Sequence, residues 1–271
     1  MTEVTRRDIA AAFRAAGAVR GDTVMFHGSL RSMGCVQGGA AAVIDGILDA
    51  SSPGGTVGAA TLWYNGNPAE CRKEDFDAET SPTWTGLLAE TLRKDPRSLR
   101  SNSFSHSVSA VGARARELTE RHGEGRPYPS PWSEESFSEI SPWSKFYLWN
   151  ALYAFIGVDM DTCTMKHYIE SRFVAELLDQ LPPERYTEFR SQIAMDCKSI
   201  LWIFYPGAQM RARLEEKGLV TKIPLGNTTL MTIRTRPLVD ATLDILRAAP
   251  EAWCSPEFAS WIARVKAARR S

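Results

Sequence analysis

The chain of 271 residues is long enough for one large α/β domain, and its 44% hydrophobic and 24% charged residues are typical of a globular protein. Its 32 basic side chains balance 32 acidic ones, so it lacks the basic excess expected of a nucleic-acid-binding protein. No apolar run is long enough to span a bilayer, and the N-terminal segment has no continuous apolar core of a secretion signal.

The cysteines are scattered along the chain and odd in number, and no close pair is typical of a zinc or redox motif. We therefore expect free thiols in the reducing cytoplasm. The five residues concerned are Cys35, Cys71, Cys163, Cys197 and Cys254.

Helices and strands alternate in the first half of the chain. Apolar periodicity and Gly/Pro punctuation predict, in order, a helix over 5–16, a strand over 23–26, a helix from Gly38 to Pro53 and a strand over 56–62. A strand, a helix and a strand at this spacing are typical of a crossover unit in a partly parallel sheet. The same rules predict a helix over 85–92, a strand over 108–111 and an amphipathic helix over 112–122.

The second half mixes long polar segments with apolar elements. The polar segment 63–83 is expected to be a long loop, which inside a compact domain is usually functional or disordered. The segment 123–145, rich in Gly, Pro, Ser and Trp, is expected to be another long surface segment. The later elements expected are a strand within 146–158, a helix over 164–178, strands over 219–224 and 228–233, a helix over 237–248 and a basic helix ending at Arg270. Without a repeat or a composition break, we expect a single domain over 1–271.

A Gly/Ser-rich turn, His27–Gly34, follows the first predicted strand. Backbone N–H groups at the start of a helix suit a phosphate, and Arg31 adds a two-pronged donor. The spacing matches neither the P-loop nor the dinucleotide fingerprint. Taken by itself, such a turn more often binds nothing.

The segment 161–170 carries a catalytic pattern on a predicted helix that Thr162 or Thr164 is able to cap. His167 and Glu170 stand three residues apart, so both side chains project from one helical face. A carboxylate beside an imidazole holds its tautomer and raises its basicity, as a general base requires. The alternative is a surface ion pair. Two ligands do not make a zinc site, and we expect no metal.

Other candidate residues are weaker when each is taken alone. His106 precedes a predicted strand, where a hydrogen-bonded structural histidine is commoner than a catalytic one. Asp77 and Glu79 precede a helix and either meet a cationic amine or cap and face solvent. The aromatic side chains of Trp63 and Tyr64 suit a flat or weakly charged acceptor.

Taken together and in order, these segments resemble the aminoglycoside 3-N-acetyltransferase family, also called the antibiotic N-acetyltransferases. The resemblance implies one α/β/α-type unit around a central mixed sheet. It extends from about residue 20 to about residue 230 and rests on the stretches GDTVMFHGSLRSMG, GGAAAVIDGILD, PGGT, FDAETSPTWTG, HSVSAVGARARELTERH, SPWSKF, GVDMDTCTMKHYIE and GLVTKIPLGN.

The resemblance also implies roles for particular residues. The turn Ser29, Leu30, Arg31 and Ser32 is expected to hold the pyrophosphate of acetyl-CoA, the co-substrate. His106, Ser107, Val108 and Ser109 are expected along the pantetheine arm. In a ternary complex without an acyl-enzyme, His167 takes a proton from the acceptor amine, and Glu170 orients the imidazole. The partners are then an acyl-CoA and a small amine, with no nucleic acid or membrane, and a homodimer is left open.

A base is needed because an alkylamine with a pKa near 10.4 is almost entirely protonated at pH 7, so presenting the free base costs roughly 4–5 kcal/mol. General-base assistance commonly contributes about 10²–10⁴-fold. The tetrahedral oxyanion then needs N–H donors, for which the backbone near Ser107–Ser109 is the candidate.

The chain departs from the family pattern near the expected acceptor pocket, at Asn102–Ser105 and at Ala60–Tyr64. Polycationic aminoglycosides usually meet an acidic cleft, whereas this chain carries no net charge. Three functions therefore stay open: acetylation of an aminoglycoside, acylation of another amine in natural-product biosynthesis, with or without a phosphate or phosphonate group, and coenzyme A binding without catalysis.

Overall fold

The structure, a computed structural model, describes residues 3–65, 72–193 and 201–269. Cys71, Cys197 and Arg270, which entered the sequence predictions, lie outside these ranges. Cys35, Cys163 and Cys254 are free thiols. Within the described ranges, no helix combines the length and the apolar character that crossing a membrane requires.

A seven-stranded mixed sheet runs through the molecule in the order β3-β4-β2-β1-β5-β7-β6. The central strands β2, β1 and β5 are parallel, and the outer strands join them antiparallel. The predicted β1–α2–β2 crossover and mixed sheet are thereby confirmed. The strands are β1 (Thr23–Gly28), β2 (Thr56–Ala60), β3 (Leu99–Arg100), β4 (Val108–Gly112), β5 (Leu152–Ile156), β6 (Thr221–Leu225) and β7 (Thr228–Arg234).

Alternation along the central strands builds two cores, one on each face of the sheet. In β1, Val24 and Phe26 belong to one core and Met25 belongs to the other, because successive side chains of a strand point to opposite faces. The first face is covered by α1 (Arg6–Ala15), α2 (Gly39–Ser51) and α3 (Leu87–Lys94).

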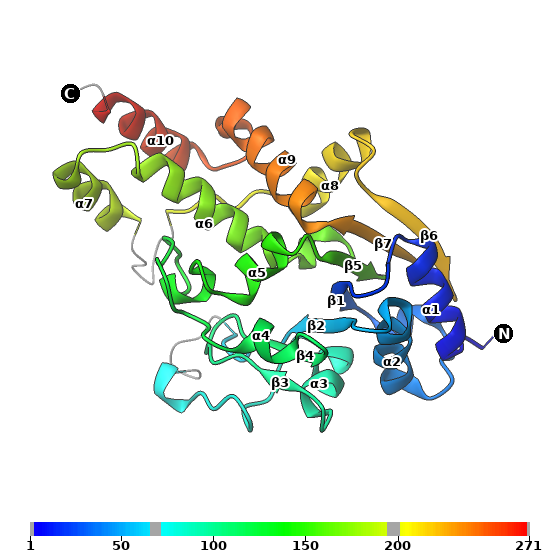
Figure 1. The fold of residues 1–271 in the computed structure, drawn as a ribbon. Helices are drawn as coiled ribbons and strands as arrows, with labels where there is room; N and C mark the ends of the chain where they lie inside the picture. The colour runs from blue at the N-terminus through cyan, green and yellow to red at the C-terminus, as the bar shows by residue number, and fades with distance from the viewer. Residues whose placement is uncertain (1–2, 66–71, 194–200, 270–271) are drawn as a thin grey trace.

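The opposite face carries the larger core, over which α6, α9 and α10 lie together (Figure 1). An α/β/α arrangement results, as expected. The helices on this face are α4 (Ala115–Thr119), α5 (Pro142–Leu148), α6 (Met165–Leu178), α7 (Pro183–Gln192), α8 (Gly207–Glu216), α9 (Thr235–Ala248) and α10 (Pro256–Ala268).

Several sequence predictions need correction. The helix predicted over 112–122 extends only over α4, and the expected strand within 146–158 is shared between α5 and β5. Ser141 caps α5, and Pro142 occupies its first turn, both of which favour a helix start. Asn150, at φ 51°, turns the chain between α5 and β5. Strand β3 and helices α7 and α8 were not predicted.

The topology gathers the expected site residues at one edge of the sheet. The parallel strands β1, β2 and β5 end there, and the antiparallel strands β4 and β7 begin there. This edge therefore receives the turn after β1, the residues before β4 and the start of α6, which lie far apart in the sequence.

Candidate active site

His167 and Glu170 form a hydrogen-bonded pair on α6. The distance from His167 Nδ1 to Glu170 Oε2 is 2.9 Å. The carboxylate is fully buried, whereas 23% of the imidazole side chain is exposed. Because a carboxylate accepts hydrogen bonds, this contact favours the tautomer in which Nδ1 donates, and Nε2 is the ring nitrogen left for another partner. The pair predicted from the i, i+3 spacing is therefore present, with the free nitrogen on the accessible imidazole.

Two further residues contact Glu170, and sequence reasoning missed both. The indole Nε1–H of Trp202 donates to Glu170 Oε2 at 3.0 Å. The Lys166 ammonium lies 3.9 Å from Oε1, which has no hydrogen-bond partner among the described residues. Lys166 stands four residues before Glu170, so helix spacing offered a signal for it, whereas nothing local pointed to Trp202.

Aromatic rings surround His167. The ring centroids of Trp132 and His106 lie 5.3 and 5.5 Å from that of His167, and Phe137 lies at 6.3 Å. Phe204, 40% exposed, continues this wall at 6.1 Å from Trp132. The imidazole is thus open to solvent on part of its surface and enclosed by aromatic groups elsewhere.

His106 is held by a chain of hydroxyl groups. Its Nδ1 lies 3.1 Å from Ser105 Oγ, which is 2.6 Å from Ser136 Oγ, and Ser103 Oγ is 3.1 Å from that same oxygen. Burial, together with the neighbouring His167 and His122, lowers the pKa of His106 well below its ordinary value. A neutral His106 therefore faces His167.

The first turn of α6 is held by another histidine rather than by a threonine cap. The Thr164 side chain makes no capping hydrogen bond. Instead the Thr164 N–H donates to His27 Nε2 at 3.4 Å, and the Met165 N–H donates to the Tyr153 hydroxyl at 3.2 Å. His27 Nε2 also lies 2.8 Å from that hydroxyl. Since burial lowers the pKa of His27 to about 4, His27 serves here as a neutral acceptor that anchors α6.

The turn Ser29, Leu30, Arg31 and Ser32 lies at the end of β1 as expected, in a short 3₁₀ helix rather than an α-helix. Ser29 Oγ accepts from the Ser32 N–H at 3.3 Å, and the Ser29 N–H donates to Ile156 O of β5 at 2.9 Å. Arg31 is exposed. The turn is therefore anchored between β1 and β5 with its basic side chain toward solvent.

Ser107, Val108 and Ser109 are fully buried. Ser107 Oγ donates to Thr61 O at 2.7 Å, and Ser109 Oγ lies 3.0 Å from Thr61 Oγ1. The Val108 N–H already donates to Ser101 Oγ at 2.9 Å, so this amide is not free for an oxyanion. Of the segment 106–109, His106 is the residue whose side chain faces His167.

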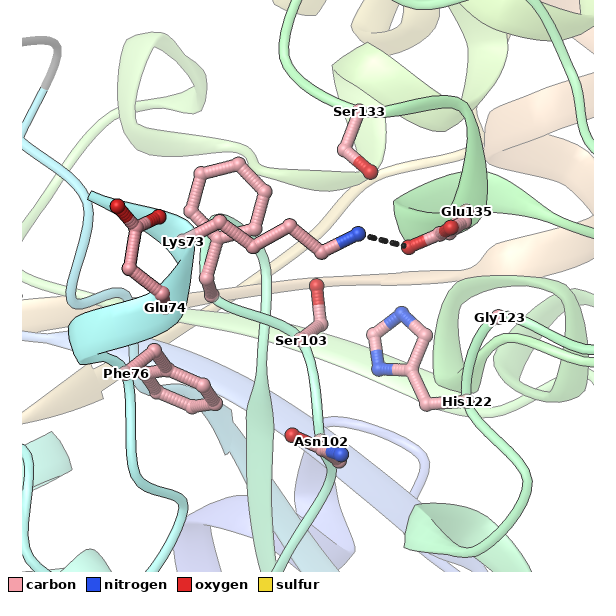
Figure 2. A pocket seen from close by; sticks show the side chains of 10 residues that line it. Lys73, Glu74, Phe76, Asn102, Ser103, His122, Gly123, Ser133 and Glu135 are labelled. Carbon is pink, nitrogen blue, oxygen red and sulfur yellow. Dashed lines mark hydrogen bonds and ion pairs between the residues drawn. The ribbon is translucent and has the colours of Figure 1, made fainter. Parts of the chain in front are cut away.

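A cavity of about 630 Å³ opens beside the hydroxyl chain, with Ser103 in its wall (Figure 2). Lys73 and Glu135 both line this cavity, and the Lys73 Nζ lies 3.0 Å from Glu135 Oε2. Glu74 adds a second carboxylate. His167 is not among the described residues that line this cavity. A chain of hydrogen bonds leads from Ser103 in the cavity wall through Ser136 and Ser105 to His106, whose ring faces that of His167.

The expected acceptor residues lie around this cavity but not all in its wall. Trp63 packs on Phe76 at 5.7 Å and Tyr64 on Phe104 at 5.6 Å, and both phenyl rings line the cavity. Asp77 is a turn residue whose Oδ1 accepts the Glu79 and Thr80 N–H groups at 2.8 Å, and these bonds lower its pKa.

Glu79 is also exposed, and its carbonyl accepts from Arg93 at 2.9 Å. In the described residues, neither Asp77 nor Glu79 lines the cavity.

Comparison with solved structures defines the class of protein first. The apoenzyme of aminoglycoside acetyltransferase AAC(3)-IVa superposes with a TM-score of 0.72 at 20% identity, covering 96% of this chain and 95% of that one. AAC-IIIb, in a binary complex with CoASH, gives 0.71 at 21% identity over 94% of this chain and 99% of that one. At these identities the likeness shows that the fold is that of the aminoglycoside acetyltransferases.

Sequence comparison then identifies the family. The family model described as aminoglycoside 3-N-acetyltransferase matches residues 25–247. Aminoglycoside N(3)-acetyltransferase III of Salmonella sp is 29% identical over 212 residues, which cover 73% of this chain and 69% of that protein. The chain belongs to the aminoglycoside 3-N-acetyltransferase family and is an acyltransferase. The resemblance found in the sequence is confirmed.

Proposed function

We propose that this chain, as one domain over 1–271, transfers the acetyl group of acetyl-CoA to a primary amine of an aminoglycoside or a related antibiotic. The observation that carries the mechanism is the pair formed by His167 and Glu170, in which a fully buried carboxylate engages the imidazole of a partly exposed histidine at 2.9 Å. A coenzyme-A-binding protein without catalysis has no need of such a base.

An ammonium acceptor loses two protons: one is released to solvent when the free amine forms, and one leaves the nitrogen as it attacks. His167 Nε2 accepts the second proton from the attacking nitrogen and passes it on, while Glu170 stabilises the imidazolium that forms. The nitrogen forms a bond to the thioester carbonyl carbon in a ternary complex, the carbon–sulfur bond breaks, and the thiolate takes up a proton. Starting from an ammonium group, the products are the amide, the free thiol and one released proton.

Acetyl-CoA as the donor is supported by a solved relative that holds CoASH. In this chain, the Ser29–Ser32 turn stands at the expected edge of the sheet, with exposed Arg31 as a donor to phosphate. His106 and His167 face each other farther along that edge, toward β4.

An aminoglycoside acceptor is supported by the family and by relatives solved with a gentamicin or with sisomicin. The carboxylates Glu74 and Glu135 beside the cavity suit an ammonium group, although Lys73 already pairs with Glu135.

The aromatic groups favour a second candidate function, N-acylation of a less charged amine in natural-product biosynthesis. Phe76 and Phe104 line the cavity, Trp132 packs against His167, and Phe204 packs against Trp132. Flat apolar walls bind hydrophobic faces better than polycations. The cytoplasmic location expected from the sequence stays a prediction, and the oligomeric state stays open.

The test is thiol release from acetyl-CoA with a panel of aminoglycosides and of small aromatic and aliphatic amines. His167→Ala is expected to lower kcat by about 10²–10⁴-fold, the usual contribution of a general base. Coenzyme A affinity, measured by calorimetry, should change less than about twofold, because the expected phosphate turn lies elsewhere.

Glu170→Gln should lower kcat as well, whereas Glu184→Gln, on an exposed position of α7, should leave it unchanged. Near-normal turnover of the His167→Ala enzyme would refute the mechanism. Coenzyme A binding with no thiol release from any amine would favour the non-catalytic alternative.

A further inference from the structure

The two oxygens of Glu170 have different surroundings. Oε2 accepts hydrogen bonds from His167 Nδ1 at 2.9 Å and from Trp202 Nε1 at 3.0 Å. Oε1 has no hydrogen-bond partner in the described part of the chain, where the Lys166 ammonium pairs with it at 3.9 Å. A fully buried carboxylate with one bare oxygen is costly unless a charge compensates it.

Trp202 fixes the direction of the carboxylate. Its indole donates to the oxygen that also faces His167, so rotation of the carboxylate about its own axis breaks two hydrogen bonds. Trp202 is 3% exposed, and an indole N–H only donates, so this buried group needs an acceptor, which Glu170 Oε2 supplies.

Lys166 supplies the charge. Its side chain is only 17% exposed, and its ammonium lies 5.2 Å from the centroid of the Tyr205 ring. Such an enclosed ammonium interacts more strongly with a neighbouring carboxylate than a surface lysine does. It also disfavours a second positive charge on the adjacent imidazole.

Three other titratable side chains next to the pair, His106, Cys163 and Tyr205, are uncharged at neutral pH. The pKa of His106 is lowered well below its ordinary value, chiefly by burial. Burial raises the pKa of Cys163 to about 11 and that of Tyr205 well above its ordinary value.

Several charged side chains on the elements packed against α6 are engaged with other groups, whereas Glu184 of α7 is exposed. Glu134 pairs with Arg190, Glu135 with Lys73, Arg185 with Glu188, and Arg247 with Glu176 and Asp244. Lys145 donates to the Leu118 and Glu120 carbonyls, Asp240 accepts from the Tyr147 hydroxyl, and Arg264 lies over the Phe189 ring.

We propose that Trp202 and Lys166 are positioning residues of the active site. Trp202 holds the carboxylate of Glu170 in the direction that serves His167, and Lys166 supplies the positive charge that balances this buried carboxylate and opposes a second positive charge on the imidazole. This inference rests on the proposed function for its consequence in catalysis, but not for its effect on the histidine itself.

Lys166→Met removes the charge and keeps the length of the side chain. Without the cation, His167 takes up a proton at a higher pH, so the acid limb of kcat/KM should move upward by about one pH unit, as expected for a charge a few ångströms away. Activity on that limb should then fall by up to about tenfold and return toward the wild-type value on the alkaline plateau.

Lys166→Arg should restore the wild-type limb, and Lys217→Met, at an exposed position after α8, should leave the profile unchanged. A merely structural lysine would lower activity at every pH, without moving the limb.

Trp202→Phe keeps an aromatic ring and removes the N–H. Here the alkaline plateau of kcat itself should fall about tenfold, the loss expected for one hydrogen bond to a charged group. The acceptor KM should change much less, because Trp202 contacts the carboxylate and not the cavity.

A direct readout follows the histidine Cε1–H resonances by NMR across pH, since the chain has only 4 histidines and His167→Ala assigns the one concerned. In Lys166→Met, the His167 midpoint should rise by about one unit relative to wild type. This readout needs neither donor nor acceptor.

An unchanged midpoint in Lys166→Met, or a wild-type plateau in Trp202→Phe, would overturn the assignment of that residue. If His167→Ala is inactive while Lys166→Met titrates like wild type, the proposed function stands and this inference fails. If the midpoint shifts in Lys166→Met but the His167→Ala variant stays active, this inference stands for Lys166 and the proposed function fails.

Discussion

The missing side chain of Gly157 leaves room for the Ser29–Ser32 turn. Gly157 has φ +63°, and an added Cβ would overlap Ser32 Oγ and lie 2.7 Å from Thr228 Oγ1. The end of β5 and the turn after β1 therefore approach one another closely only because residue 157 is glycine. Residue identity here controls the position of the expected phosphate-binding turn.

Gly157→Ala is expected to displace that turn. The protein should lose about 1–3 kcal/mol of unfolding free energy through backbone strain, and its affinity for coenzyme A should fall because Ser29 and Ser32 move. Urea unfolding and calorimetry measure the two effects. Gly218→Ala is the matched control, since Gly218 has φ +69° and nothing within 4 Å of an added Cβ. Equal coenzyme A affinities in the two variants would contradict this role of the turn.

At the scale of elements, the two-residue strand β3 ties the acceptor side of the site to the sheet. Arg100 donates to Ser81 O and Thr61 O at 2.5 Å and to Ser107 Oγ at 3.1 Å. Burial lowers the pKa of Arg100 to about 10, so the side chain still carries its charge at neutral pH. Its guanidinium also lies 5.0 Å from the Phe76 ring, which lines the cavity.

Arg100→Met should therefore loosen the segment before α3 and reshape the cavity. Three acceptors lose their donor, which is expected to lower the unfolding free energy by about 2–4 kcal/mol and to raise the acceptor KM more than it lowers kcat. Steady-state kinetics and urea unfolding provide the measurement. Arg72→Met, which removes only exposed pairs with Glu74 and Asp75, should leave the unfolding free energy and the acceptor KM nearly unchanged. A KM unchanged in Arg100→Met would count against the cavity as the acceptor site.

Across the whole molecule, three histidines are kept neutral by the fold. Burial lowers the pKa values of His27 and His122 to about 4 and that of His106 well below its ordinary value. The unfolded chain takes up protons on these residues below about pH 6.5, whereas His27 and His122 in the folded protein do not until about pH 4. Since the unfolded state binds more protons in that interval, their contribution to stability is present above pH 6.5 and is lost as the pH falls toward 4.

The unfolding free energy should therefore decrease by about 2 kcal/mol for each of His27 and His122 between pH 7 and 4.5, after allowance for partial solvent screening. Urea unfolding at the two pH values tests this. His122→Asn keeps a hydrogen-bonding group near Ser101 and should remove one histidine's share of the pH dependence. A free energy independent of pH over this range would contradict the neutral histidines.

The local pattern of the sequence was sufficient for the residues that helix and strand geometry bring together. His167 and Glu170 were predicted as a pair because residues three apart share a helical face, and the crossover through α2 followed from apolar spacing and Gly/Pro punctuation. The segment 146–158 was assigned wrongly because apolar residues alone do not distinguish a buried helix from a strand. The left-handed turn at Asn150 made that division.

By itself, the sequence determined the family, the mixed α/β fold and the pairing of His167 with Glu170, since each depends on local periodicity or on motifs in order. Only the tertiary structure decided that Trp202, 32 residues from Glu170, donates to the same oxygen as His167, and that Ser107 and Ser109 turn inward toward Thr61. It likewise placed His106 against His167. Such contacts depend on how distant segments pack around a shared core, and no periodicity within a segment carries that information.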